Sequence, residues 1–580
     1  MRKIKFLILM TMIAATTAES AFAQQEDKLM IYQMIPRLFG NKQSQNIPYG
    51  TIAQNGVGKF NDISDKAIAG IKELGMTHIW YTGVIAHASL TDYSKYGIPT
   101  ADADVVKGRA GSPYAIRDYY DVDPDLAVDV KKRMKEFAAL VDRTHKNGLK
   151  VIIDFVPNHV ARSYQSQAKP ANVIDFGAKD DKTVAYHPAN DYYYVPGKDL
   201  QVPKSDDPND GLASLKNGLY KESPAKATGN NVFSEAPSIN DWYETVKLNY
   251  GVDYQNNNQT HFDPIPPVWT KMRDILTYWA KKDVDGFRCD MAEMVPLEFW
   301  NWVIPELKKV KPELVFIGEA YDPSAYENYL TKGKFDYLYD KVGLYDGLRR
   351  LMRSDSNATT RDIDHVWQVE SATFGNRMLR FLENHDEQRI ASKDFAGNPF
   401  LAIPAMVVSA TLSGGPVMLY FGQEVGEAAN GSEGFSGEDG RTTIFDYWGV
   451  PAHQQWMNNG KFDGALLSKE QLELRNFYKT LLNIAGKSAA IIRGKHYNLP
   501  FYQNDKVYAY IRYTDEERML IVVNFDRSQP FEADLQMPDM VMSNRAITAV
   551  TEVLNGAAVT FKEQSIAVKV NPGAAQIIKF

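Results

Sequence analysis

The stretch "VDGFRCDM" (284–291) joins a short apolar run to Arg288 and Asp290, which stand two residues apart. Side chains two apart on an extended strand project to the same side. The stretch therefore predicts a buried strand that presents an arginine and an aspartate together. Two interpretations follow: an exposed ion pair, or a functional site in which the arginine keeps the aspartate ionised. The lone cysteine, Cys289, alternates to the opposite side, which predicts a buried and inert thiol.

Seven other stretches have the same strand-like character, and several also end on polar residues. They are "LMIYQMIP" (29–36), "MTHIWYTGV" (76–84), "LKVIIDFV" (149–156), "LVFIGEAY" (314–321), "FDYLYD" (335–340), "RMLRFLENH" (377–385) and "PVMLYFGQE" (416–424). Helical stretches lie between them, such as "SDKAIAGIKELG" (64–75), which opens on a capping serine and closes on glycine. Eight strands alternating with helices predict an α/β fold, a parallel (β/α)8 TIM barrel. A doubly wound open sheet is the alternative, and the strand count and polar strand ends favour the barrel.

The alternation is interrupted once and stops before the C-terminus. Residues 161–267 are rich in Asp, Asn, Gly, Pro and Tyr and show little periodicity, which predicts a B subdomain inserted after strand three. From 489 to 580, alternating stretches such as "KVYAYIRYT" and "RMLIVVNFD" predict a C-terminal all-β sandwich domain. The barrel would then comprise residues 24–160 and 268–488.

The first 23 residues have the features of an export signal. A basic start is followed by the apolar "FLILMTMIAA" (6–15) and by "AFA" (21–23), which is typical of a cleavage site. A membrane anchor is the alternative, but the apolar run is short for a bilayer span. We therefore expect a signal peptide over 1–23 and an exported protein, periplasmic or secreted. No later stretch predicts a transmembrane helix, and a single cysteine excludes an internal disulfide.

The formal net charge of −7 over 580 residues gives no broad basic surface that would call for nucleic acid. Four predicted strands instead end in carboxylates: Asp154, Asp290, Glu319 and Asp386. The C-terminal strand ends of a barrel converge on one pocket. For a single acid, a helix cap or a salt bridge would be the simpler explanation. Four acids at one pocket favour a functional site.

Glycoside cleavage is a chemistry that uses paired carboxylates and no thiol or redox cofactor. One carboxylate attacks the anomeric carbon and an acid protonates the leaving oxygen; in retaining enzymes the two lie about 5–5.5 Å apart. Arg288 would hold Asp290 ionised, whereas Glu319 follows Gly318 on an apolar strand, where desolvation favours its protonated form. This contrast predicts the two roles.

Four motifs carry a resemblance to a known family: "DFVPNH" (154–159), "GFRCD" (286–290), "GEA" (318–320) and "ENHD" (383–386). In order and spacing they resemble the motifs of the α-amylase family of glycoside hydrolases (glycoside hydrolase family 13). The insertion after strand three and the C-terminal β domain also resemble that family. The resemblance implies that Asp290 is the nucleophile, that Glu319 is the general acid/base, and that Asp386 binds sugar hydroxyls and helps to distort the ring.

The resemblance also implies substrate-binding residues around the trio. Arg288, His159 and His385 would line the same subsite, and Tyr114 in "SPYAIRDYYDVDP" (112–124) would stack on the sugar. The alternatives are satisfied core histidines and a tyrosine that packs its own loop. Asp154 would orient the site rather than react.

Two features leave specificity and metal content open. Many family members carry Lys-His shortly after the nucleophile, where this chain has Glu293 and Met294, so its acceptor-side specificity is undetermined. Asn158 matches a residue that often binds a structural calcium ion in the family, which makes calcium a possible cofactor. Further oxygen ligands are present in "KSDDPNDG" (204–211), which could equally be a solvated loop.

The predicted function is retaining hydrolysis of α-1,4-glucosidic bonds in starch-type glucans or maltooligosaccharides, through a covalent glycosyl-enzyme intermediate. Exo-acting or 1,6-directed α-glucosidases and transglycosylases share the same trio and are alternatives. A barrel that only binds carbohydrate is a further alternative, which the presence of all three acids disfavours.

Overall fold

The computed structural model describes residues 28–203, 218–435, 437–499, 504–542, 547 and 549–580. The predicted signal peptide and the acidic stretch 204–211 therefore lie outside the described residues. Over the described residues, no helix has the length and apolar character needed to span a bilayer.

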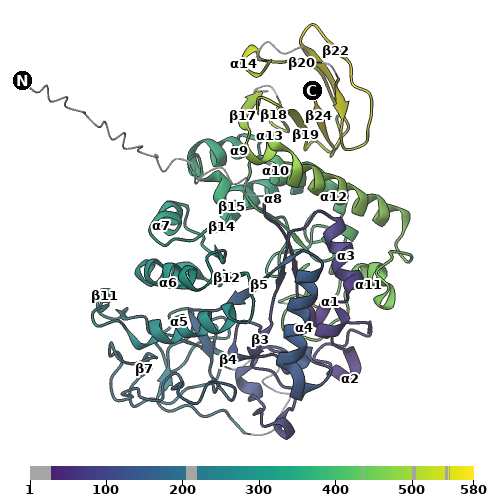
Figure 1. The fold of residues 1–580 in the computed structure, drawn as a ribbon. Helices are drawn as coiled ribbons and strands as arrows, with labels where there is room; N and C mark the ends of the chain where they lie inside the picture. Colours follow the sequence, from purple (N-terminus) through teal and green to yellow (C-terminus); the bar gives the residue numbers. More distant parts are fainter. Residues whose placement is uncertain (1–27, 204–217, 436, 500–503, 543–546, 548) are drawn as a thin grey trace, which may run out of the picture.

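Eight parallel strands form the centre of the molecule (Figure 1). They are β1 (Met30–Met34), β2 (His78–Tyr81), β5 (Lys150–Phe155), β12 (Gly286–Cys289), β13 (Val315–Gly318), β14 (Tyr337–Tyr339), β15 (Met378–Leu379) and β16 (Val417–Tyr420). Their order is β15-β14-β13-β12-β5-β2-β1-β16, and a parallel bridge between Arg380 and Val417 joins the two ends of the sheet. The predicted (β/α)8 barrel is confirmed, and each of the eight predicted stretches contains one of these strands.

Alternation along the strands separates two apolar layers. One set of residues fills the barrel interior: Ile31, Trp80, Ile152, Ile317, Tyr339, Leu379 and Met418. Their neighbours in sequence, such as Ile153, Phe316 and Leu338, belong to the larger core between strands and helices, as do Phe287 and Cys289 on β12. Since side chains two apart share a face, Asp154 and Glu319 follow Ile152 and Ile317 on the inner side. This alternation brings the strand-end acids to one end of the barrel interior.

Helices surround the sheet. They are α1 (Pro36–Phe39), α2 (Ile52–Asn55), α3 (Asp65–Glu73), α4 (Arg133–Lys146), α5 (Pro267–Ala280), α6 (Leu297–Val310), α7 (Tyr326–Thr331), α8 (Asp346–Arg353), α9 (Arg361–His365), α10 (Ile403–Thr411), α11 (Pro451–Met457) and α12 (Lys469–Lys487). The predicted cap of α3 is present, because the Ser64 side chain accepts a hydrogen bond from the Ala67 N–H. Beyond α4, Gly148 takes a φ of 75°, which favours glycine.

Short strands occupy the two long loops after β2 and β5. They are β3 (Ile85–His87), β4 (Ile116–Val122), β6 (His159–Ala161), β7 (Tyr194–Val195), β8 (Ala225–Lys226), β9 (Thr245–Lys247), β10 (Val252–Asp253) and β11 (Gln259–Thr260). β6 pairs antiparallel with β9 and so fastens the end of the insertion to its beginning. Figure 1 shows β4 and β7 at the end of the molecule opposite the C-terminal strands. The predicted subdomain boundaries remain predictions.

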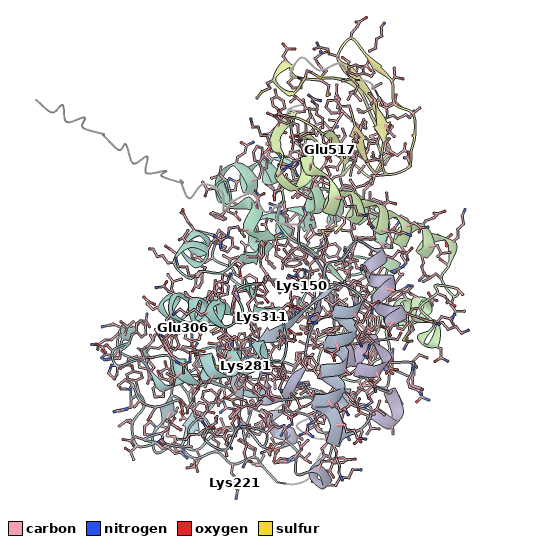
Figure 2. The ribbon with its side chains drawn as sticks, in the orientation of Figure 1. Lys150, Lys221, Lys281, Glu306, Lys311 and Glu517 are labelled. Carbon is pink, nitrogen blue, oxygen red and sulfur yellow. The ribbon has the colours of Figure 1, made fainter. Side chains whose placement is uncertain are left out.

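The C-terminal part forms two packed sheets, as predicted. One has the order β17-β18-β19-β24-β21 and the other β20-β23-β22, and a separate apolar cluster lies between them. The elements are α13 (Ala489–Arg493), β17 (Lys495–Leu499), β18 (Val507–Tyr513), β19 (Arg518–Asn524), β20 (Phe531–Gln536), α14 (Asp539–Met542), β21 (Thr551–Glu552), β22 (Phe561–Lys562), β23 (Ser565–Val570) and β24 (Ala575–Lys579). Glu517, labelled in Figure 2, ties these sheets to the barrel because its carboxylate accepts from the Ser488 hydroxyl and the Ala490 N–H.

Candidate active site

A single buried arginine organises the carboxylates at the strand ends. Arg288 Nη1 lies 2.8 Å from Asp290 Oδ1 and 3.3 Å from Asp154 Oδ1, and Nη2 lies 2.7 Å from Glu319 Oε2. Its Nε donates to the Tyr339 hydroxyl at 3.1 Å. One guanidinium therefore joins residues of four neighbouring strands, β5, β12, β13 and β14, and it brings the predicted nucleophile and the predicted acid/base to the same place.

The predicted electrostatic contrast between the two carboxylates is not what the structure shows. Arg288 was expected to hold Asp290 ionised, yet it pairs with Glu319 as closely. Burial raises the pKa of Asp290 well above its usual range, and Glu319 and Asp154 raise it further, against the lowering effect of Arg288. Three carboxyls around one cation repel one another when all are ionised. The cluster therefore retains a proton more readily than separated carboxyls would.

The hydrogen bonds of the two carboxylates distinguish them instead. Asp290 Oδ2 is buried and has no hydrogen-bond partner among the described residues. Glu319 is held on both sides: Oε2 accepts from the Met291 N–H at 2.7 Å and pairs with Arg288, while Oε1 accepts from the Tyr321 hydroxyl at 2.5 Å. Met291 has a φ of 42°, an uncommon value for a residue with a side chain, where the chain leaves the strand. Asp290 therefore has the free oxygen that a nucleophile needs.

Asp386 is the most open member of the trio. Its side chain is 39% exposed, and Oδ2 lies 3.0 Å from His385 Nε2. Burial opposes ionisation here, but His385 and Arg288 hold the pKa of Asp386 below its usual value. The other ring nitrogen of His385 meets Gln33 Nε2 at 2.8 Å, which fixes the ring between the two contacts. An ionised, accessible carboxylate suits the predicted binding of sugar hydroxyls.

Tyr114 is anchored by its hydroxyl. That group contacts His385 Nε2 at 2.5 Å and donates to Asp154 Oδ1 at 3.3 Å. The ring stacks on His385 with centroids 5.2 Å apart, and the Arg288 guanidinium lies 5.4 Å from its centre. The residue is 9% exposed. Tyr114 thus lies in the wall of the same site, while its stacking on a sugar stays a prediction.

His159 belongs to the same sequence motif as Asp154, but it lies on a different element, at the start of β6. Burial lowers the pKa of His159 to about 3, so the ring is neutral at ordinary pH. Asn158 Nδ2 meets its Nδ1 at 3.0 Å, and the Trp242 ring lies 5.5 Å away. Its predicted contact with the substrate remains a prediction.

Several residues of the site were not singled out from the sequence. Trp80 Nε1 donates to Asp154 Oδ2 at 2.9 Å, and the Tyr339 hydroxyl accepts a hydrogen bond from Arg288 Nε. Gln33 Nε2 contacts His385 Nδ1. All three lie on barrel strands, so the alternation that identified the carboxylates could also have identified them. Tyr321 follows a strand in a loop, and no periodicity indicates its contact.

The candidate calcium ligand Asn158 is already engaged by protein groups. Its Oδ1 accepts a hydrogen bond from the buried Lys247 Nζ, which also donates to the Met294 carbonyl at 3.1 Å. Asn158 Nδ2 donates to the Gly229 carbonyl at 2.8 Å. Burial lowers the pKa of Lys247 to about 7, but its amino group takes the Asn158 oxygen in either protonation state, so this position does not fit a calcium ion. Among the described residues, no group of three or more His, Cys, Asp or Glu side chains is placed to hold a metal ion, and residues 204–211 lie outside them.

Cys289 is buried on the outer side of β12, as predicted from alternation. Burial raises the pKa of its thiol well above the ordinary value, so the group stays protonated and unreactive.

The comparisons with known proteins agree with this geometry. Residues 33–446 match the family model described as alpha amylase, catalytic domain, and residues 501–574 match maltogenic amylase, C-terminal domain. Alpha-amylase 3 of Dictyoglomus thermophilum is 23% identical over 524 residues, which cover 86% of this chain and 88% of the relative. Neopullulanase 2 of Thermoactinomyces vulgaris is 22% identical, with 88% and 71% covered.

Solved structures show the same fold. An alpha-amylase from Geobacillus thermoleovorans, complexed with acarbose, superposes with a TM-score of 0.60 at 22% identity, covering 95% of this chain and 98% of that chain. A maltogenic alpha-amylase from Thermotoga neapolitana gives a TM-score of 0.59 at 21% identity, covering 96% and 99%. Both likenesses extend over the barrel, the inserted segment and the C-terminal sheets.

Proposed function

The chain belongs to the α-amylase family of glycoside hydrolases, and from this premise we propose that it hydrolyses α-1,4-glucosidic bonds of starch-type glucans or maltooligosaccharides with retention of configuration. One observation supports the mechanism most: a single guanidinium joins Asp290 to Glu319, and Oδ2 of Asp290 has no hydrogen-bond partner within the described part of the chain. That arrangement suits one nucleophile and one acid around the same sugar.

The first step forms a covalent intermediate. The free Oδ2 of Asp290 attacks the anomeric carbon while the bond to the glycosidic oxygen breaks, and Glu319 delivers its proton to that departing oxygen. Asp386, ionised beside His385, holds the sugar hydroxyls. Arg288 keeps its charge throughout, because its neighbouring acids raise its pKa against the effect of burial. It thereby offsets the negative charge that moves between the two carboxylates.

The second step releases the sugar. Glu319, now a carboxylate, takes a proton from water as the water oxygen attacks the anomeric carbon, and the bond to Asp290 breaks. The two inversions return the α configuration. After both steps Glu319 is protonated and Asp290 is ionised again.

The substrate class rests on the relatives. Their names include alpha-amylases, a neopullulanase, a cyclomaltodextrinase and a maltogenic alpha-amylase, which together point to α-glucans. Exo action, 1,6 cleavage and transglycosylation use the same trio and are the second candidate. Sized products from starch, maltotriose, pullulan and isomaltose separate these activities: internal fragments from starch support the first candidate.

Turnover tests the proposal directly. Purified protein should release the phenol from an aryl α-maltooligoside, and Asp290→Asn should lower kcat by about 10⁴-fold or more, because it removes the nucleophile. A wild-type protein that is inert on every α-glucoside, yet binds maltooligosaccharides, would instead support the carbohydrate-binding alternative.

We also propose that the protein is exported, since residues 1–23 have the pattern of a cleaved signal. Expression in a Gram-negative host, followed by fractionation and N-terminal sequencing, should give an exported protein that begins at Gln24. Full-length protein in the cytoplasmic fraction would contradict this proposal.

A further inference from the structure

The loop after β13 places a tyrosine directly on the predicted acid/base. The Tyr321 hydroxyl donates to Glu319 Oε1 at 2.5 Å, and the residue itself is only half-buried. We propose that Tyr321 is a positioning residue for Glu319, that it identifies Oε1 as the oxygen that carries the transferred proton, and that Glu293 holds Tyr321 in place. This inference rests on the proposed glycoside hydrolysis and extends it.

The two oxygens of Glu319 have different surroundings. Oε2 accepts from the Met291 N–H and lies 2.7 Å from Nη2 of the Arg288 guanidinium, so one donor points at it and a positive charge lies beside it. A proton on Oε2 would face this donor and this charge, which disfavours protonation there. Among the residues that the structure describes, Oε1 meets only the Tyr321 hydroxyl, a group that can donate or accept. The proton that leaves with the glycosidic oxygen is therefore carried on Oε1.

Tyr321 can serve both protonation states of the acid/base. When Glu319 is a carboxylate, the hydroxyl donates to Oε1 and stabilises the charge. When Glu319 is protonated, Oε1 donates its hydrogen to the glycosidic oxygen and the hydroxyl no longer needs to donate. Burial and the neighbouring Glu319 raise the pKa of Tyr321 far above its usual value. The phenol therefore stays neutral and keeps its hydrogen at every working pH.

Glu293 fixes the loop that carries the tyrosine. Its Oε2 accepts from the Tyr321 N–H at 2.9 Å and from the Asp322 N–H at 3.2 Å. Glu293 thus ties the segment after β12 to the segment after β13. This contact accounts for a glutamate at position 293, where many family members carry a lysine. A lysine, as many family members carry here, has no acceptor for those two N–H groups.

A leaving-group comparison tests the role of Tyr321. Fluoride departs without protonation, whereas the alcohol of maltotriose needs a proton from Glu319. For Tyr321→Phe we expect kcat/KM to fall about tenfold on maltotriose, roughly the value of one hydrogen bond to a charged group, and to change by less than about twofold on α-maltosyl fluoride. A residue that only shapes the fold or binds sugar would lower both values alike.

The pH profile provides a second readout. Loss of a donor to the carboxylate form makes Glu319 hold its proton to higher pH, so the alkaline limb of kcat/KM on maltotriose should move up by about one pH unit. Tyr326→Phe is the matched control. It removes a hydroxyl from the next helix, α7, that has no hydrogen-bond partner among the described residues, and it should leave both readouts unchanged.

Variants of Glu293 test the anchor without altering the tyrosine. Glu293→Gln keeps an oxygen that can accept the two N–H groups and should retain most of the activity. Glu293→Ala should reproduce the pattern of Tyr321→Phe, with a loss on maltotriose and little loss on the fluoride. Circular dichroism and Tm confirm that each variant is folded, and Glu293→Ala tests the proposal independently should Tyr321→Phe fail to fold.

The outcomes separate the inference from the function it rests on. Equal losses on the two substrates, or an unmoved alkaline limb, would overturn the role of Tyr321 while wild-type turnover still supports hydrolysis. Wild-type protein that turns over neither substrate would overturn the proposed function itself.

Discussion

The two ends of strand β12 hold carboxylates in opposite circumstances. At the N-terminal rim, Asp285 lies 3.0 Å from Lys311 Nζ and 2.7 Å from His145 Nε2, and it accepts from the Val151 N–H. Burial opposes ionisation, yet these partners hold the pKa of Asp285 below its usual value. Figure 2 labels Lys311 and Lys150, the residue before Val151, in this part of the barrel.

At the C-terminal end of β12, the carboxyl groups outnumber the cations. One guanidinium faces three carboxyls, Asp290 Oδ2 is left without a partner among the described residues, and the pKa of Asp290 is raised. A carboxylate with complete partners contributes to stability, whereas one with an unused oxygen is available for chemistry. This strand thus provides stability at one end and reactivity at the other.

Removal of the central cation should have the largest effect on stability. Arg288→Met leaves three carboxyls buried without their partner, so we expect a loss of about 3–5 kcal/mol in the free energy of unfolding. We also expect kcat to fall by about 10²–10³-fold, since the charge that offsets both carboxylates is gone. Denaturant unfolding and turnover of an aryl α-maltoside measure the two. A variant as active as wild type would show that the arginine is only a structural residue.

At the other end of the strand the effect should be confined to stability. Asp285→Asn weakens two ion pairs, so we expect the free energy of unfolding to fall by about 1–3 kcal/mol while kcat/KM stays within about twofold. Asp283→Asn is the matched control, because this neighbour contacts the same cations but is 67% exposed. Its Tm should change much less. A loss of activity in Asp285→Asn would show that Asp285 contributes to catalysis as well as to stability.

The pH dependence of stability tests whether the pKa of Asp290 is raised in the folded protein. Because the pKa of Asp290 is raised in the folded state, its contribution to stability is present below the unfolded value of about 3.9 and is lost as the pH rises through the folded value. Asparagine does not titrate. The Tm of Asp290→Asn relative to wild type should therefore increase from pH 4 upward. A difference that is constant with pH would contradict a raised pKa for Asp290.

Chelation should have the smallest effect. Since Lys247 Nζ takes the Asn158 oxygen that a calcium ion would need, we expect EDTA to leave Tm and kcat unchanged, and added calcium to restore nothing. A fall in Tm with EDTA that calcium reverses would place a calcium site elsewhere in the chain.

The sequence predicted the barrel and the position of the site better than it predicted the electrostatics. Alternation in "GFRCD" placed Arg288 and Asp290 on one face and Cys289 on the other, because a period of two is fixed by strand geometry. The pairing of Arg288 with Glu319 depends on the register between neighbouring strands, in which Arg288 lies beside Ile317. Single-strand periodicity contains no such information.

Contacts between loops were the least predictable. Asn158 was a candidate calcium ligand, and β9 of the insertion brings Lys247 to it through a pairing across a long stretch of irregular sequence. Tyr321 and Glu293 meet for a similar reason, since the loops after β12 and β13 are neighbours only once these two strands have paired. Non-local pairing decides both contacts.

Trapping of the covalent intermediate tests the central claim most directly. Glu319→Gln should still form the intermediate from α-maltosyl fluoride, which needs no acid, but should hydrolyse it slowly because no base activates water. Mass spectrometry of the digested protein should then find a maltosyl group on the peptide that contains Asp290. Rapid turnover with no label, or a label on another residue, would contradict the account.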